Sequence, residues 1–211
     1  MILYSIQDFK IFEALSRGET HYAHHPYLNV DDADIVDEMF VRSYNWLADR
    51  MVERIGPRPS AEIYPTWAYY QWYGPDQKKP DLRYTGTRCF ARDRTCALMT
   101  LDIPDDQVLL SEYDAWHFVL NQSYLGEEAR SDELWDIRKE LKCREYDKYP
   151  EWMKKEIEDS WYTIFDFDLS AKLLEYDKSQ QIIQATFWKI EPGYLKAAVK
   201  FNTTGKSIKV L

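Results

Sequence analysis

Apolar positions recur along the chain with two periods, one typical of strands and the other of helices. Residues 2–6, ILYSI, predict a short opening strand. Phe9, Phe12 and Leu15 follow at helical spacing, and Gly18 suits the left-handed position that often ends a helix. A strand followed directly by a short helix is therefore expected at the start of the chain.

The middle of the chain alternates longer helical and strand patterns. Asp31 or Asp32 is placed to cap a long amphipathic helix that ends near Ile55, where GPRPS at 56–60 breaks the pattern. The later expected elements are strands at 61–70, 96–103 and 108–110, a short helix after Ser111, and a charged helical region at 131–165, interrupted at Tyr149-Pro150. Two more strands around a short turn are expected within QQIIQATFWKIEPGYLKAAVKF, residues 180–201.

These elements predict one α+β domain, in which helices flank a split, mostly antiparallel sheet. The chain has 211 residues, 45% of them hydrophobic, which suffices for one substantial core. It contains no internal repeat and no linker long enough to separate two domains. The domain is expected to span residues 1–202, and residues 203–211 are expected to form a weakly ordered tail.

Composition predicts a cytoplasmic protein that does not contact a membrane. No apolar stretch approaches the length of a membrane span, and the start, MILYSIQDF, lacks a basic region followed by an apolar run. Three cysteines without a CxxC pair favour a reducing compartment and argue against a zinc site built on thiolates. The HYAHH motif at 21–25 has no matching carboxylate or thiol cluster, so no metal is expected.

Charge and aromatic residues single out one stretch for nucleic-acid binding. The formal charge of −9 argues against polyanion binding by the whole surface, but residues 78–94 are rich in cations and follow six aromatic residues within 64–73. Cations beside stacking aromatics suit RNA or DNA, whereas the alternative is a solvated basic loop. The candidate contacts to nucleic acid are Lys78, Lys79, Arg83, Arg88 and Arg92.

Polar residues interrupt two strands that are otherwise apolar. Gln184 and Thr186 lie two positions apart in the late strand, and Ser5 and Gln7 repeat that spacing in the opening strand. Residues two apart share a face of a strand, so the two pairs are expected to converge on one wall of a ligand cleft. Alternatively, these side chains bond to each other or to the adjacent backbone, because an unpaired buried amide or hydroxyl costs about 1–3 kcal/mol.

Several stretches resemble a bacterial family known only as domain of unknown function 3841. These stretches are LYSIQ at the start, YPTWAYY followed by KPDLR, LDIPDDQVLLSEYDAWHFVLN, and IQATFWKI near the end. They cover most of the chain apart from residues 130–160. This resemblance implies no activity.

A second resemblance is to ADP-ribosyltransferases, most closely to the branch of toxins that modify DNA. It rests on the opening Leu-Tyr-X-Ile-X strand, the short helix that ends in Gly, and a last strand that begins Gln-Ala-X. The resemblance implies an ADP-ribosyltransferase-like fold with NAD, as substrate, in a cleft between two small sheets. The first strand would support the nicotinamide ribose, and a carboxylate on a late strand would stabilise the cationic ribose.

The resemblance also implies a role for individual residues. Gln184 would bind the ribose hydroxyls, while Thr186 stands where the family has its catalytic Glu and cannot carry the negative charge. Asp114 or Glu112 would then supply the missing carboxylate. Asp114 also lies three positions before a His, as a base and its orienting group would, although capping of the helix explains it as well. The residues expected to contact NAD are Ser5, Gln7, Tyr22 and Trp67.

Three functions follow from these patterns. The first is an NAD-dependent ADP-ribosyltransferase of toxin type that modifies a nucleic acid, with Arg83 taking a phosphate through paired hydrogen bonds. The second is a catalytically degenerate module that binds a nucleotide or RNA. The third is an interaction subunit of a toxin–antitoxin type complex, held by an antitoxin protein.

Overall fold

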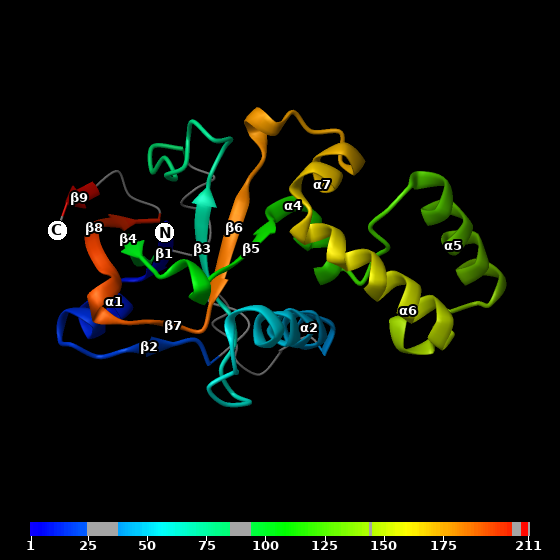
Figure 1. The fold of residues 1–211 in the computed structure, drawn as a ribbon, viewed down its shortest axis with the longest axis horizontal. Helices are drawn as coiled ribbons and strands as arrows, with labels where there is room; N and C mark the ends of the chain where they lie inside the picture. Colours follow the sequence, from blue (N-terminus) through cyan, green and yellow to red (C-terminus); the bar gives the residue numbers. More distant parts are fainter. Residues whose placement is uncertain (25–37, 85–93, 144, 204–207, 211) are drawn as a thin grey trace.

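The computed structural model describes residues 1–24, 38–84, 94–143, 145–203 and 208–210, and its main feature is a seven-stranded antiparallel sheet (Figure 1). A second sheet pairs β2 (His21–Tyr22) with β7 (Lys189–Ile190). The predicted α+β class with a mostly antiparallel sheet is confirmed. In spatial order, the strands of the main sheet are β5 (Leu109–Glu112), β6 (Ile183–Phe187), β3 (Thr66–Gln71), β1 (Ile2–Asp8), β4 (Thr95–Asp102), β8 (Leu195–Asn202) and β9 (Ile208–Val210).

Helices cover both faces of the sheet and extend beyond its β5 edge (Figure 1). The helix α1 directly follows β1 and packs on one face, while α2 and α4 pack on the other. The α-helices of the described residues are α1 (Phe9–Ser16), α2 (Glu38–Ile55), α4 (Tyr113–Leu120), α5 (Glu128–Glu140), α6 (Glu151–Ser160) and α7 (Phe167–Leu173). Short 3₁₀ turns lie at Asp105–Gln107, Tyr146–Lys148, Trp161–Phe165, Lys178–Gln180 and Pro192–Tyr194.

The two faces of the sheet bury different cores. The first, which we call the α1 face, carries Leu3, Ala68 and Ala185 against α1. The opposite face, which we call the helical face, carries Leu109 and Trp67 against α2 and α4. Because side chains alternate along a strand, the identity of these core residues assigns every other residue of the same strands to one face.

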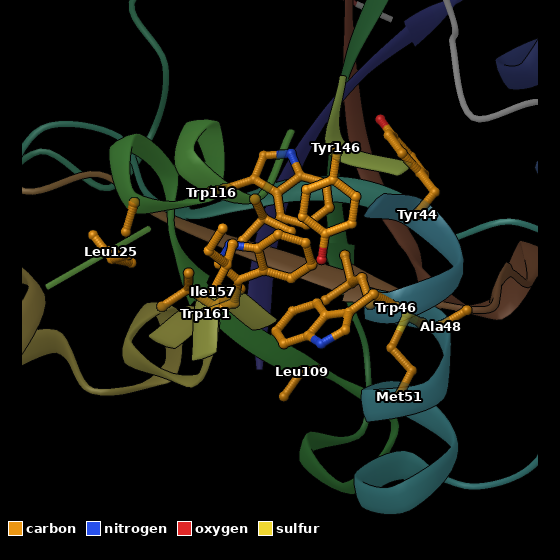
Figure 2. Packing of buried hydrophobic residues seen from close by; sticks show 14 of the residues in the cluster. Tyr44, Trp46, Ala48, Met51, Leu109, Trp116, Leu125, Tyr146, Ile157 and Trp161 are labelled. Atoms are coloured by element: carbon orange, nitrogen blue, oxygen red, sulfur yellow. The ribbon is translucent and has the colours of Figure 1, made fainter. Parts of the chain in front are cut away.

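Aromatic side chains dominate the core of the helical face (Figure 2). The Trp161 ring is fully buried and meets Trp46 edge-on, with the ring centroids 5.4 Å apart. Tyr44 contacts Trp116 edge-on at 5.7 Å. Edge-to-face pairs of this kind stabilise a core by about 0.5–1.5 kcal/mol beyond the area they bury. They hold α2, α4 and the 161–165 turn together beside β5.

Most elements lie close to where the hydrophobic pattern predicts them. The helical region is interrupted at Pro150, the N-cap residue directly before α6, and β4 matches its expected range within one residue. The described part of the long helix ends at Ile55 as expected, whereas its expected caps at 31 and 32 lie outside the described residues. The two late strands, β6 and β8, are not neighbours, because β3, β1 and β4 lie between them. Residues 208–210 of the expected tail form β9, which pairs with β8.

Among the described residues, four helices end in the same hydrogen-bonded turn, and one of the four uses glycine for it. After α1, the N–H of Gly18 bonds to the Leu15 carbonyl and the next N–H reaches back to Ala14. The equivalent left-handed positions after α4, α5 and α7 are Gln122, Lys142 and Glu175, with φ of 52°, 54° and 56°. A side chain at such a position strains the backbone, so these three turns are less stable than a glycine would make them.

Candidate functional site

A row of polar and aromatic side chains crosses five strands on the helical face. Ser111 of β5 pairs with Gln184 of β6, which pairs with Tyr69 of β3; Tyr69 pairs with Tyr4 of β1, and Tyr4 with Thr100 of β4. Residues that pair directly across antiparallel strands project to the same face. We call these five residues the polar row. Its Ser111 end is buried, and Tyr69, Tyr4 and Thr100 are half-buried.

The buried end of the row is held by hydrogen bonds within the sheet. The Gln184 side-chain amide donates to the Ser111 hydroxyl at 3.2 Å, and Gln184 is only 4% exposed. Two residues further along β6, the Thr186 hydroxyl donates to the Leu109 carbonyl at 3.2 Å, and Thr186 is fully buried. Both predicted residues therefore lie on one face, as their spacing implies, but each also joins β6 to β5.

Ser5 and Gln7 lie on the opposite face of the sheet from Gln184 and Thr186. Ser5 pairs with Met99, and Gln7 pairs with Ala97, both of which belong to the core of the α1 face. The Ser5 hydroxyl donates to the Trp67 carbonyl at 2.7 Å and accepts from the Gln7 amide at 2.8 Å. The expected convergence of the two polar pairs on one cleft wall is wrong. The sheet separates them, although only β3 stands between their strands.

The residues that take the place of Ser5 and Gln7 on the helical face are their neighbours in β1. Tyr4 and Ile6 alternate with them and share the face of Gln184. On β3, Tyr69 occupies the equivalent position and pairs with both Tyr4 and Gln184. Tyr69 is packed deeply enough that burial raises the pKa of its hydroxyl well above the ordinary value. Sequence reasoning missed both tyrosines. Spacing shows which residues of one strand lie on the same face, but it does not show which residues of a neighbouring strand lie on that face.

Trp67 and Tyr22 serve mainly as packing residues. Trp67 pairs with Thr186 and lies beside Gln184 on the helical face, but its ring contacts Tyr44 and Trp116, with centroids at 5.8 Å and 5.2 Å. Its indole N–H is buried and has no partner among the described residues. Tyr22 lies on β2, opposite Lys189, and packs against the same aromatic core. The structure therefore brings Trp67, but not Tyr22, next to the polar row.

A pair of carboxylates lies where β5 passes into α4. Glu112 is fully buried, and one of its oxygens accepts the Ala115 N–H at 2.5 Å while the other has no partner among the described residues. Burial, reinforced by the nearby charge of Asp114, raises the pKa of Glu112 to about 7. Asp114 bonds to the hydroxyl of Tyr176, and burial together with this carboxylate raises the pKa of Tyr176 to about 12.

The sequence predicts that Glu112 or Asp114 supplies the carboxylate that is missing at Thr186, but neither side chain joins the polar row. Alternation along β5 turns Glu112 away from Ser111, and its side chain caps α4 instead. Asp114 is directed to Tyr176 and not to His117, whose ring nitrogen lies 3.0 Å from the Tyr113 carbonyl oxygen. Glu112 and Asp114 do form one cluster, in which Glu112 is fully buried and Asp114 is half-buried.

Within the described part of the basic stretch, Lys79 lies over the polar row, whereas Lys78 lies over Tyr70, which packs on the α1 face. The ammonium of Lys79 is 5.9 Å from the ring centroid of Tyr4, and that of Lys78 is 5.4 Å from Tyr70. Arg83 is exposed and forms paired hydrogen bonds with Asp81, and this bonding lowers the pKa of Asp81 to about 2. The other two candidate cations, Arg88 and Arg92, lie outside the described residues.

The fold and the row define this chain as an α+β domain in which a buried amide and half-buried phenols lie side by side on the helical face. The chain belongs to the family described as Domain of unknown function (DUF3841), which it matches over residues 2–195. No curated protein and no solved structure matches it.

The described residues also bear on metal binding and on membrane insertion. Within these ranges, no group of three or more His, Cys, Asp or Glu is arranged to hold a metal ion. The side chain of His21 in the HYAHH motif is largely buried, and this burial lowers its pKa to about 4. No helix in the described part of the chain is long and apolar enough to cross a membrane.

Proposed function

We propose that this domain binds NAD, or a nucleotide of similar chemistry, against the polar row on the helical face. The observation that carries the proposal is the direct pairing of Gln184, Tyr69 and Tyr4 across three adjacent strands. The resemblance to ADP-ribosyltransferases implies that the opening strand and the Gln-Ala-X strand both contact NAD, and these strands are β1 and β6. The contacts on β1 are then Tyr4 and Ile6 in place of Ser5 and Gln7.

The chemistry of the row suits the nicotinamide ribose end of the ligand. A carboxamide and phenol hydroxyls exchange hydrogen bonds with ribose hydroxyls, and tyrosine rings pack against a planar base. Lys79, over the Tyr4 ring, is close enough to the row to meet a phosphate of the same ligand. Together these groups would recognise a base, a sugar and a phosphate in turn.

Transfer of ADP-ribose to a nucleic acid is the second candidate function. Thr186 is fully buried and bonded to a carbonyl, so it does not replace the catalytic Glu. The observation in favour of transfer is the cluster of Glu112 and Asp114, because it follows directly on the strand that carries Ser111. Asp114 is the better candidate for stabilising a cationic ribose, since Glu112 is half protonated near neutral pH. RNA or DNA as acceptor, and an antitoxin as protein partner, stay predictions.

The test compares two substitutions on opposite faces of the same sheet. Tyr69→Phe removes one hydroxyl from the row, and we expect it to weaken NAD binding about tenfold, the effect of losing one good hydrogen bond. Ser5→Ala removes a hydroxyl from the α1 face and should leave the affinity unchanged. Titration calorimetry with NAD, performed well below both melting temperatures, measures the affinity independently of any loss of stability.

Catalysis is tested separately by transfer of label from NAD to RNA, DNA or protein. Transfer that Asp114→Asn abolishes, with NAD affinity retained, would support the second function. Binding without transfer would support the first alone. Equal affinity of Tyr69→Phe and the wild-type protein for NAD, or no NAD binding by either, would show that the row is not the site.

A further inference from the structure

The helix α5 lies at the far end of the molecule from α1 (Figure 1). A pocket of about 450 Å³ opens there, which is within the usual size range of small-ligand sites. The residues that line it are Trp135, Arg138, Lys139, Lys142 and Cys143. Three of the five are cations and none is acidic. None of them belongs to the polar row or to the basic stretch at 78–94.

Aromatic and cationic groups are layered in this pocket. Trp135 is 51% exposed, a large fraction for an indole, and the guanidinium of Arg138 lies 4.7 Å from the centroid of its ring. Arg138 also lies 4.9 Å from the ring centroid of Tyr149, so its side chain is fixed between two rings. Its Nε is buried and has no hydrogen-bond partner among the described residues. The ammonium of Lys139 approaches the Trp135 ring as well, at 5.3 Å.

The turn after α5 brings the last cation to the pocket. Cys143 N–H bonds back to the Arg138 carbonyl, and Lys142 N–H bonds to that of Lys139. These bonds place Lys142 and Cys143 beside the side chains of the last helical turn. Cations in that turn also offset the negative end of the helix dipole, which explains their sign. The helix dipole explains neither the exposed indole nor the concave shape.

We propose that this pocket binds a nucleotide, with its base stacked on Trp135 and its phosphate between Lys142 and Lys139. Exposed aromatic rings beside cations are the means by which proteins bind bases and their phosphates without reading sequence. Arg138 provides a fixed charge on the inner side, and Lys139 exchanges its bond with Asp136 for the phosphate. The nucleotide is either free or part of a single strand, since both present the same base and phosphate.

Cys143 reports occupancy of this pocket directly. Its thiol is half-buried in the pocket wall, whereas that of Cys96 is buried in the sheet. Alkylation of the native protein, followed by peptide mass spectrometry, gives the rate of modification at each thiol. We expect AMP or a ten-nucleotide oligo(A) to slow modification of Cys143 several-fold and to leave that of Cys96 unchanged. Protection by both ligands indicates a site for a free nucleotide, and protection by oligo(A) alone indicates a site for a strand.

Two glycine substitutions separate binding from folding. Lys142→Gly removes a cation from the pocket and relieves the left-handed backbone strain, so the variant should fold at least as well as the wild-type protein. Glu175→Gly makes the same backbone change after α7 and serves as the control. Lys142→Gly should lower the affinity for the protecting ligand on the order of tenfold. It should also reduce the slope of log affinity against log salt concentration by about one. Glu175→Gly should not weaken binding, and Trp135→Ala should abolish protection.

Several outcomes would overturn the proposal. One is the absence of protection at Cys143 by either ligand. Another is an equal loss of affinity in Lys142→Gly and Glu175→Gly. Protection by a poly-glutamate peptide as strong as that by oligo(A) would show an unselective anion site. This test is independent of NAD binding at the polar row. Tyr69→Phe should change NAD binding, whereas Lys142→Gly should leave it unchanged.

Discussion

Replacement of Glu112 by Gln should make the domain more stable at neutral pH. Glu112 is fully buried where β5 meets α4, and only one of its oxygens has a partner in the described part of the chain. Gln has nearly the same shape and keeps an oxygen for the Ala115 N–H. It removes the charge that the buried site disfavours.

The magnitude follows from the change in pKa. Burial first, and the charge of Asp114 next, raise the pKa of Glu112 from 4.5 to about 7. The unfolded chain therefore releases its proton at a lower pH than the folded protein does. The contribution of Glu112 to stability is fully present below pH 4.5 and is lost as the pH rises through 7. The loss in the free energy of unfolding amounts to at most about 3.5 kcal/mol.

Other groups titrate in the same range, so the comparison must be a difference between two proteins. Burial lowers the pKa of His21 to about 4, and its unfolded state therefore takes up a proton first as the pH falls below 6.5. This destabilises the fold on the acid side, in opposition to Glu112. Because His21 is the same in both proteins, subtracting the profile of Glu112→Gln from that of the wild-type protein cancels its effect. Asp114 and Tyr176 face Glu112 and are likewise retained.

Urea unfolding at five pH values between 4.5 and 8.5 measures the difference. We expect the free energy of unfolding of Glu112→Gln to exceed that of the wild-type protein by an amount that grows from pH 4.5 to about pH 7. Above pH 7 the difference should stay constant. Glu127→Gln is the matched control, since Glu127 stands at the corresponding position before α5 but is exposed and makes no side-chain capping bond. A difference in the free energy of unfolding that did not change with pH would refute the raised pKa of Glu112.

Three further substitutions test the packing by the same urea titration. Gln184→Ala should destabilise the fold by about 1–3 kcal/mol, because it leaves the buried Ser111 hydroxyl without its partner; a change below 0.5 kcal/mol would contradict a role in joining β5 to β6. Gly74→Ala should cost roughly 2 kcal/mol or more, since φ is +76° and the added methyl would meet the Ser179 carbonyl oxygen at 1.9 Å; an unchanged midpoint would disprove that contact. Glu175→Gly should gain roughly 0.5–1 kcal/mol by relieving the left-handed strain, and a loss would show that its side chain is needed.

The hydrophobic pattern predicts the elements well because each depends on local periodicity. Phe9, Phe12 and Leu15 lie on one side of α1, and Gly18 ends it as expected. The order of the strands is a different kind of information. The short turn at 191–194 favours a hairpin, yet the chain crosses from β6 at one side of the sheet to β8 at the other. Long-range pairing of that kind leaves no local signal.

The assignment of faces fails for a related reason. A strand fixes which of its own residues share a face, but the pairing with its neighbours decides which face that is. Ser5 and Gln184 have the same local pattern, and one step of register along β1 brings Tyr4 to the helical face instead of Ser5. The buried polar residues of both strands find partners inside the sheet, so their polarity alone is no evidence for a ligand. What distinguishes the helical face is that its row continues from buried amide to half-buried phenols. A ligand would therefore meet Tyr69 and Tyr4 first, and a substitution at Tyr69 is a more sensitive test of binding than one at Gln184.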